Sequence, residues 1–405
     1  MREAWRWFGP QDPVGLSHIR HTGATDVVSA LHDIPIGEVW PRDAVQQHRA
    51  LIEHTPPGLA PLRWSVVESI PVHEAIKLGL PEAQEHIDRW ILSMENLAKE
   101  GIKTICYNFM PVIDWTRTHL RLPLPSGAYA LSFDQHEFAA FDLHILQRVN
   151  AEQDYSAADL ARAKQTFDAM SPQARDSLTR NIIAGLPGKM TDGYELKEFR
   201  AAVARYSNVS RQQYQSHLLS FLRQVLPRAE ALGVRLAIHP DDPPWALLGL
   251  PRVVCTEADL EELFHQLPSQ ANGMTLCVGT YGSRADNDLP HMAKRFGERV
   301  HFAHLRGVKR NAEEPRSFVE AEHLESDVDM VAVIQALLEE ETRRSATPES
   351  EIFIRPDHGH QMMGDIDKVT NPGYSGIGRL KGLAEVRGVI RTLSHLSKAR
   401  KDSAR

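Results

Sequence analysis

The sequence is poor in cysteine, in excess positive charge and in long hydrophobic runs. Its 405 residues include only 3 cysteines, and their wide spacing argues against a disulfide framework and indicates a reducing compartment. Lysine and arginine total 46 against 53 acidic residues, a net charge of −7, whereas a nucleic-acid-binding protein would carry a basic domain. No apolar run approaches the roughly 18 residues of a membrane span, and Met1–Pro10 lacks the apolar core of a secretory signal. We therefore expect a cytoplasmic protein that binds neither nucleic acid nor membranes.

The residues that are present, 42% hydrophobic and 24% charged, are typical of a globular protein. Short apolar runs rich in β-branched or aromatic residues predict strands, and amphipathic helices lie between them. This alternation indicates parallel βαβ units, and eight strands favour a (β/α)8 TIM barrel over an open sheet. The predicted strands are Asp26–Leu31, Trp64–Glu68, Ile102–Phe109, Val234–Ile238, Met274–Val278, Val300–Ala303 and Ile352–Ile354, with Phe318–Ala321 as a weaker eighth.

The third and fourth predicted strands are much farther apart than one βα unit requires. The excess, Asp114–Asn208, contains helix signals of its own: Ser156 and Asp159 can form a capping box, and Ser171-Pro172 can start a helix. We predict a single barrel domain over residues 1–405 with a helical insertion, residues 114–208, after the third strand. Such a loop lies on the face where barrel active sites form. The sequence leaves open whether it is a lid or a dimer contact.

Four residues with metal-binding chemistry directly follow or end four predicted strands: His239, Cys277, His304 and Asp357. Each alone has an ordinary structural explanation, as a hydrogen-bonded histidine, a buried cysteine or a capping aspartate. In a barrel, however, strand ends converge, so two imidazoles, a thiolate and a carboxylate can surround one divalent ion. Thiolate favours zinc or iron(II), while carboxylate tolerates manganese or magnesium, so this chemistry alone does not name the metal.

A second group of residues borders these four positions. Guanidinium groups can grip a substrate carboxylate or form salt bridges within the barrel mouth, and imidazoles exchange protons near neutral pH. The segment Asn371–Gly382 is too rich in glycine for a barrel helix, and we interpret it as a mobile turn, which is either a plain loop or a segment that closes over a substrate. The candidates are Arg306, Arg355, His358, His360, Tyr374 and Arg379, with Asn108 after the third strand and Trp7 near the exit of the first.

Several long motifs resemble one known family, and they extend from Met1 to Arg391. They include WRWFGPQDPV, VWPRD, WSVVESIPVHEAIK, CYNFMPVIDWTRT and TRNIIAGLPG in the first half. HPDDPPWALLGLPR, YGSRADNDL, HLR, RPDHGHQM and NPGYSGIGRLKGLAEVRG follow in the second half. These motifs are similar to those of the D-mannonate dehydratase family of hexuronate degradation.

The resemblance implies a xylose-isomerase-like barrel and a hydro-lyase that converts D-mannonate into 2-dehydro-3-deoxy-D-gluconate and water. It implies one Mn²⁺ or Fe²⁺ ion per chain, with ligands that match His239, Cys277, His304 and Asp357. The catalytic histidine and tyrosine of the family match His358 and Tyr374, and its substrate-gripping arginine matches Arg355. The remaining substrate-binding candidates are Trp7, Asn108, Arg306, His360 and Arg379. We expect a homo-oligomer, in the first place a dimer.

The expected reaction removes the C2 proton of the aldonate and then the C3 hydroxyl, with His358 and Tyr374 sharing the base and acid roles. The sequence does not decide which residue takes which proton. Two alternatives belong to other classes: a metal-dependent aldose–ketose isomerase on the same barrel, and a non-catalytic sugar-acid sensor. An AP-endonuclease-like barrel is disfavoured because the acidic chain offers no DNA-binding face.

Overall fold

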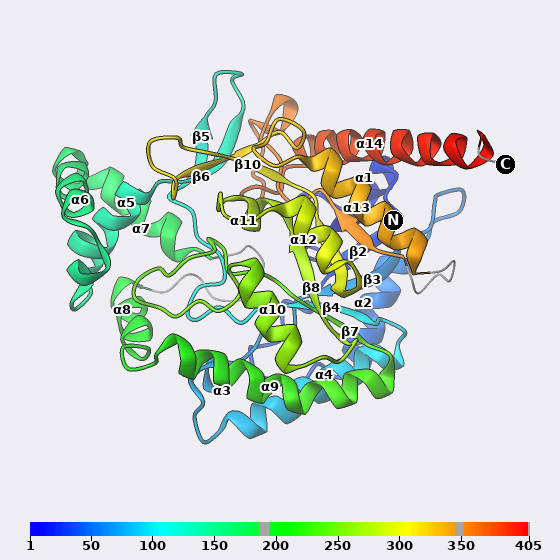
Figure 1. The fold of residues 1–405 in the computed structure, drawn as a ribbon, viewed down its shortest axis with the longest axis horizontal. Helices are drawn as coiled ribbons and strands as arrows, with labels where there is room; N and C mark the ends of the chain where they lie inside the picture. Colours follow the sequence, from blue (N-terminus) through cyan, green and yellow to red (C-terminus); the bar gives the residue numbers. More distant parts are fainter. Residues whose placement is uncertain (186–194, 345–350, 404–405) are drawn as a thin grey trace.

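The computed structural model describes residues 1–185, 195–344 and 351–403, and every structural statement below concerns these residues. At its centre eight parallel strands close into a barrel in the order β1-β12-β9-β8-β7-β4-β3-β2 (Figure 1). The predicted (β/α)8 TIM barrel is confirmed. Its strands are β1 (Arg2–Arg6), β2 (Asp26–Ser29), β3 (Arg63–Glu68), β4 (Thr104–Tyr107), β7 (Arg235–Ile238), β8 (Asn272–Cys277), β9 (Val300–His304) and β12 (Phe353–Arg355).

One barrel strand was wrongly predicted. The eighth strand is β1, which pairs with β2 and β12, and not Phe318–Ala321, which forms a strand outside the barrel. The REAWR sequence of β1 does not read as an apolar run because charged residues occupy three of its positions. Opposite charges elsewhere in the chain compensate the two arginines: Arg2 pairs with Asp26, and Arg6 with Glu68. Counting β1, the insertion follows the fourth barrel strand, β4, rather than the third.

Helices surround the barrel and cover its strands with apolar faces (Figure 1). The capping box of Thr256 and Asp259 starts α10, as its sequence indicates. Among the described residues, no helix is long and apolar enough to cross a bilayer. The helices outside the insertion are α1 (Leu16–Thr22), α2 (Arg42–Glu53), α3 (Glu74–Leu78), α4 (Ala83–Lys99), α9 (Arg211–Leu232), α10 (Glu257–Gln266), α11 (Val278–Gly282), α12 (Leu289–Arg295), α13 (Met330–Arg343) and α14 (Gly376–Ser403).

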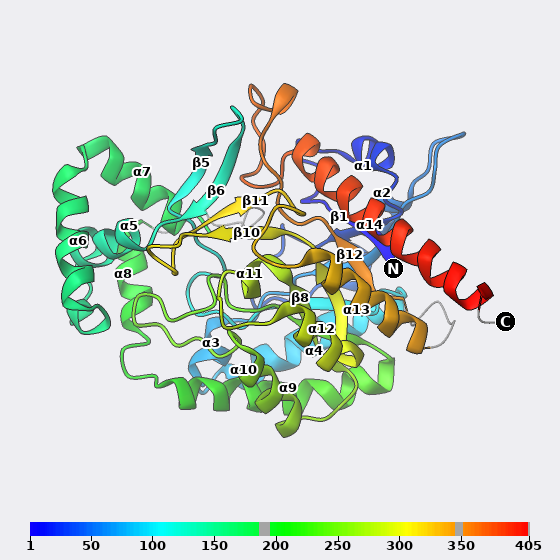
Figure 2. The same ribbon diagram turned by 45° about the horizontal axis from the view of Figure 1, so that its top comes forward.

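The insertion is only partly helical. It begins with a hairpin of β5 (His119–Pro123) and β6 (Tyr129–Phe133), and β6 pairs with β11 (Phe318–Ala321), which pairs with β10 (Gly307–Arg310). This antiparallel sheet therefore joins the loops that follow β4 and β9 (Figure 2). The helices lie to one side of the barrel: α5 (Gln135–Ala140), α6 (Ala157–Ala169), α7 (Pro172–Ile183) and α8 (Leu196–Ala204). The predicted caps at Ser156 and Ser171 are confirmed, and residues 186–194 lie outside the described residues.

The glycine-rich segment Asn371–Gly382 is not the mobile turn that its composition suggested. From Gly376 onward it is the start of α14, the long helix that packs beside the barrel. A Cβ atom at Gly378 would overlap the backbone of His360, and one at Gly359 would overlap the backbone of Gly378 and Arg379. The glycines therefore allow two backbones to approach closely, which is a packing requirement that resembles a loop signal in the sequence.

Candidate active site

A cavity of about 380 Å³ lies at the carboxyl ends of the barrel strands. This is the end at which barrel enzymes place their active sites, because the loops that follow the strands meet there. The cavity brings together residues from β1, β3, β4 and β12 and from the loops after β2, β7, β9 and β12. The predicted site residues that line it are Asn108, His239, Arg306, Arg355, Asp357, His358 and Tyr374.

Three of the four predicted metal ligands form a compact group. The ligand atoms of His239, Cys277 and His304 all lie within 4.8 Å of one another. Asp357 borders the group without completing it, since its Oδ2 lies 3.8 Å from both Cys277 Sγ and His304 Nδ1. Sequence spacing placed these side chains at separate strand ends, and closure of the barrel brings them together.

The donor atoms of this group fit a divalent ion. His239 donates from Nδ1 to the carbonyl oxygen of Pro240 at 2.7 Å, which leaves its Nε2 lone pair available. His304 Nε2 is buried and has no hydrogen-bond partner in the described chain. Burial, reinforced by Arg355, holds the pKa of His304 well below its usual range, so this imidazole is neutral as a ligand must be. Burial raises the pKa of Cys277 to about 12, so the thiolate form is stable near neutral pH only beside a cation.

Asp357 sits in a strained position between two arginines. Its φ of 59° lies in the left-handed region, which non-glycine residues adopt mainly where the surrounding structure enforces it. Arg306 Nε donates to Oδ2 at 2.5 Å, and Arg355 Nη1 donates to Oδ1. Burial raises the pKa of Asp357, but Arg355 and the other cations outweigh burial, so the pKa lies well below its usual value. The carboxylate is therefore ionised and available to a metal ion at the edge of the group.

Glu68 is a site residue that the sequence reasoning missed. It ends β3, lines the cavity and accepts hydrogen bonds from Arg355 at 2.8 and 3.0 Å, while Arg6 lies 2.9 Å away. Burial raises the pKa of Glu68, but the charges of Arg355 and Arg6 lower it by more. The pKa therefore lies below its ordinary value, and the carboxylate is ionised. The rule that selected the candidate metal ligands, a ligand-type residue at a strand end, applies equally to Glu68 and would have found it.

His358 and Tyr374, the predicted proton carriers, lie edge to face with their ring centroids 5.1 Å apart. The Tyr374 hydroxyl points toward Asp357 Oδ1 at 3.5 Å, and His358 Nε2 lies 3.8 Å from the same oxygen. Burial and the charge of Asp357 raise the pKa of Tyr374 above its ordinary value, so the phenol is neutral. Both side chains thus stand beside Asp357 at the cavity wall, as their sequence positions indicated.

A second charge network lies behind the metal-ligand group. Arg306 binds Asp242 at 2.9 Å and Glu320 at 2.6 Å, and Arg117 binds the same two carboxylates at 2.7 and 3.0 Å. Asp242, Glu320 and Arg117 were also missed. Asp242 lies in the family motif HPDDPPWALLGLPR, and Arg117 lies in the family motif CYNFMPVIDWTRT. No sequence pattern around Glu320 indicates a place in the site.

Three predicted substrate-binding residues do not line the cavity. Trp7 is buried and stacks on His48, with centroids 5.6 Å apart. His360 bonds through Nε2 to the backbone oxygen of Glu320 at 2.9 Å. Arg379 lies over the Trp5 ring at 4.2 Å and donates to the carbonyl oxygen of Arg6 at 2.9 Å. These three side chains contact other protein groups around the site and do not face the cavity.

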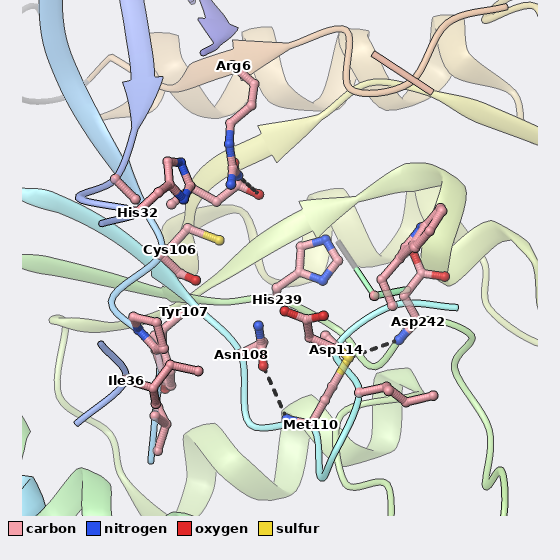
Figure 3. Close-up of a pocket in the computed structure, with 18 of the residues that line it drawn as sticks. Arg6, His32, Ile36, Cys106, Tyr107, Asn108, Met110, Asp114, His239 and Asp242 are labelled. Atoms are coloured by element: carbon pink, nitrogen blue, oxygen red, sulfur yellow. Dashed lines mark hydrogen bonds and ion pairs between the residues drawn. The ribbon is translucent and has the colours of Figure 1, made fainter. Parts of the chain in front are cut away.

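Two polar side chains from the segment after β4 point into the cavity near His239 (Figure 3). Asn108 Oδ1 accepts the Met110 N–H at 3.3 Å, so its Nδ2 is the atom directed at the cavity. Asp114 directs its carboxylate toward the same space. The cavity therefore has arginines and candidate metal ligands on one side and a donor with an acceptor on another, which suits a small anion with hydroxyl groups.

Comparison with known proteins agrees with this arrangement. The chain is 51% identical over 397 residues to a mannonate dehydratase of Chromohalobacter salexigens, which covers 98% of this chain and 100% of the relative. A crystal structure of mannonate dehydratase from Streptococcus suis serotype 2 matches with a TM-score of 0.76 at 31% identity, over 98% of this chain and 96% of that one. A xylose isomerase domain protein from Alicyclobacillus acidocaldarius has a TM-score of 0.51 at 12% identity, over 97% and 99%, which is a likeness of fold alone. The expected xylose-isomerase-like barrel is confirmed.

The profile of the family described as D-mannonate dehydratase (UxuA) matches residues 1–400. The family match, the relative that aligns over its full length and the solved structure agree with the resemblance that the sequence motifs carry. The chain belongs to the D-mannonate dehydratase family, a family of hydro-lyases.

Proposed function

We propose that this chain dehydrates D-mannonate to 2-dehydro-3-deoxy-D-gluconate and water, as a step of hexuronate degradation, with one Mn²⁺ or Fe²⁺ ion. The observation that carries the proposal is the grouping of His239, Cys277 and His304 within 4.8 Å, beside a cavity that His358 and Tyr374 also line. Family membership supports the substrate, and the grouping supports the requirement for a metal.

His239, Cys277, His304 and Asp357 would hold the ion. When bound, a divalent ion supplies Lewis-acid stabilisation for the negative charge that builds up as the C2 proton leaves. The mixture of nitrogen, sulfur and oxygen donors favours Fe²⁺ or Mn²⁺ over Mg²⁺, which prefers oxygen ligands. The orphaned, buried Nε2 of His304 supports this role, because a buried polar atom without a partner is costly unless a ligand satisfies it.

The chain supplies the two proton transfers through His358 and Tyr374. One group takes the proton from C2, and the electron pair of that bond forms the C1–C2 double bond of an aci-carboxylate. As the C2–C3 double bond forms, the C3–O bond breaks, and the second group gives a proton to the hydroxyl, which leaves as water. The resulting enol then becomes the 2-keto acid. A positioned acid or base of this kind contributes about 10²–10⁴-fold to the rate.

The remaining cavity residues suit the two ends of an aldonate. Arg355 and Arg306 place positive charge where the carboxylate of the substrate would bind. Both arginines also bind carboxylates of the protein. Asn108 and Asp114 offer a donor and an acceptor to the hydroxyl groups of the tail. This arrangement would orient the substrate with its carboxylate toward the metal ligands.

Incubation of the Mn²⁺-loaded protein with D-mannonate and with its C2 epimer, D-gluconate, tests the function. We expect the 2-keto-3-deoxy acid from D-mannonate. A product from neutral aldoses or ketoses alone would indicate the isomerase alternative, and tight binding of D-mannonate without any product would indicate a sensor. Light scattering of the same preparation tests the expected dimer.

A further inference from the structure

Glu320 joins three parts of the chain that the barrel alone does not connect. Its Oε1 lies 3.1 Å from Nδ1 of His358, 2.6 Å from Nη1 of Arg306 and 3.0 Å from Nη2 of Arg117. Glu320 belongs to β11, Arg117 to the insertion and His358 to the segment after β12. All of these side chains are buried. A carboxylate with three cationic or polar partners in one buried place is held in a single orientation.

We infer that Glu320 is a positioning residue for His358 and that Arg117 of the insertion anchors it. The inference rests on the proposed dehydratase function, because it assigns a role within the same site. It extends the active site outward from the barrel to the antiparallel sheet of β5, β6, β10 and β11 and gives the insertion a part in catalysis.

The hydrogen bond determines which nitrogen of His358 faces the reaction. An ionised carboxylate only accepts hydrogen bonds, so Nδ1 of His358 carries the proton and donates it to Glu320. Burial raises the pKa of Glu320, but Arg306 and His358 outweigh it and keep the carboxylate ionised. In the neutral ring, Nε2 then carries the lone pair, on the side of Asp357 and the cavity. This tautomer can accept the C2 proton, as an imidazole oriented by a carboxylate does in a catalytic triad.

Arg117 has little freedom to move, which makes it an effective anchor. Its guanidinium lies 4.9 Å from the Trp115 ring and 4.8 Å from the Phe318 ring. It also donates to the backbone oxygen of Thr116 at 2.9 Å and to Asp242 at 2.7 Å. Phe318 is on β11, two residues before Glu320, and β11 pairs with β6 of the insertion. The insertion therefore fixes Glu320 through both the backbone sheet and the Arg117 side chain.

The test compares Glu320→Gln and Arg117→Lys with the wild type as Mn²⁺-loaded enzymes. Glu320→Gln keeps the size of the side chain but removes the charge that selects the tautomer. We expect its kcat on D-mannonate to fall about 10²-fold or more, with KM within about threefold of wild type and the metal-to-protein ratio unchanged. Arg117→Lys keeps the charge but loses the planar fork, so we expect a smaller fall in kcat, about tenfold.

Glu137→Gln is the matched control, since Glu137 lies in the same insertion and pairs with His119 at 2.7 Å without lining the cavity. Its kcat should stay within about twofold of wild type. The imidazole ¹⁵N shifts of His358, assigned through His358→Asn, give a readout independent of turnover: wild type should show protonated Nδ1 and unprotonated Nε2, and Glu320→Gln should change this pattern.

The inference is overturned if Glu320→Gln and Arg117→Lys both retain kcat within about threefold of wild type, or if Nε2 of His358 carries the proton in wild type. Parallel loss of kcat, metal and thermal stability in both variants would also overturn it, because that pattern marks a structural role. If wild type forms no product from D-mannonate, the proposed function fails, and the ¹⁵N spectrum still tests the tautomer.

Discussion

Arg355 donates two hydrogen bonds to the carboxylate of Glu68, at 2.8 and 3.0 Å, although 287 residues separate them in the chain. A two-point pair of this kind fixes the plane of the guanidinium. Arg355 also reaches Asp357 through Nη1. The arginine expected to grip the substrate is therefore held in place by the end of β3, and Glu68 sets its orientation.

We expect Glu68→Gln to lower the free energy of unfolding at pH 7 by about 3 kcal/mol, because it leaves buried arginine charge without its partner. The pKa of Glu68 is below its ordinary value in the folded protein, since the arginines outweigh burial. Its stabilising effect is then complete above the ordinary carboxyl pKa of about 4.3 and is lost as the pH falls below it.

Urea unfolding of the metal-free proteins between pH 7 and pH 3 measures this difference. It should shrink on acidification, and a difference that stays constant over this range would contradict the prediction. Glu85→Gln is a suitable control, because Glu85 pairs with Arg89 on the exposed surface of α4. Such exposed pairs contribute about 1 kcal/mol or less.

Cys277→Ser and Asp357→Ala should each reduce the amount of Mn²⁺ or Fe²⁺ that remains bound after gel filtration. The first replaces a soft sulfur donor, and the second removes the carboxylate beside the ligand group. Elemental analysis of the purified proteins gives the metal-to-protein ratio. Cys255→Ser, which changes a buried cysteine outside the ligand group, should leave the ratio unchanged. An unaltered ratio in both site variants would refute the ligand assignment.

Metal affinity should rise with pH. Burial raises the pKa of Cys277 to about 12, so near neutral pH the free protein holds a thiol and metal binding must displace its proton. Displacement of one proton strengthens binding about tenfold for each pH unit below that pKa. Competition with a chelator of known pH dependence between pH 6.5 and pH 8.5 measures the slope. Cys277→Ser should flatten it, and a pH-independent affinity in wild type would count against a thiolate ligand.

Tyr374→Phe and His358→Asn should bind metal as wild type does but lose turnover by about 10²-fold or more, because each removes one proton-transferring group. Tyr129→Phe, a change on the β5–β6 hairpin, provides the control. Assays with Mn²⁺ in excess, together with elemental analysis, separate lost chemistry from lost metal. Rates near wild type for both variants would remove these residues from the mechanism.

Arg379→Lys should reduce stability rather than substrate affinity. The guanidinium lies over Trp5 and bonds to the carbonyl oxygens of Arg6 and Ser375, outside the cavity. Loss of these contacts should cost roughly 1–3 kcal/mol of unfolding free energy. KM for D-mannonate should stay within about twofold. A large rise in KM at unchanged stability would instead restore the substrate-binding role that the sequence suggested.

Local patterns in the sequence were sufficient for the barrel and for bringing together the candidate metal ligands. Seven barrel strands carry β-branched and apolar runs of their own, and the ligand-type residues end or follow these strands, as His304 ends β9 and His239 follows β7. Because strand ends of a closed parallel barrel converge, spacing along the chain was enough to gather them. The glycine-rich start of α14 was wrongly predicted as a turn, because composition alone does not distinguish close backbone packing from a turn.

The tertiary structure decided the features that depend on partners far away in the chain. The charged strand β1 joins the barrel because Arg2 and Arg6 meet Asp26 and Glu68. Glu320 enters the site because β11 pairs with the insertion rather than with the barrel. A buried charge is tolerable only beside an opposite charge, and its partner has no fixed offset along the sequence. The periodicity of apolar residues could therefore be read from the chain, whereas the ion-pair network around the site required the fold.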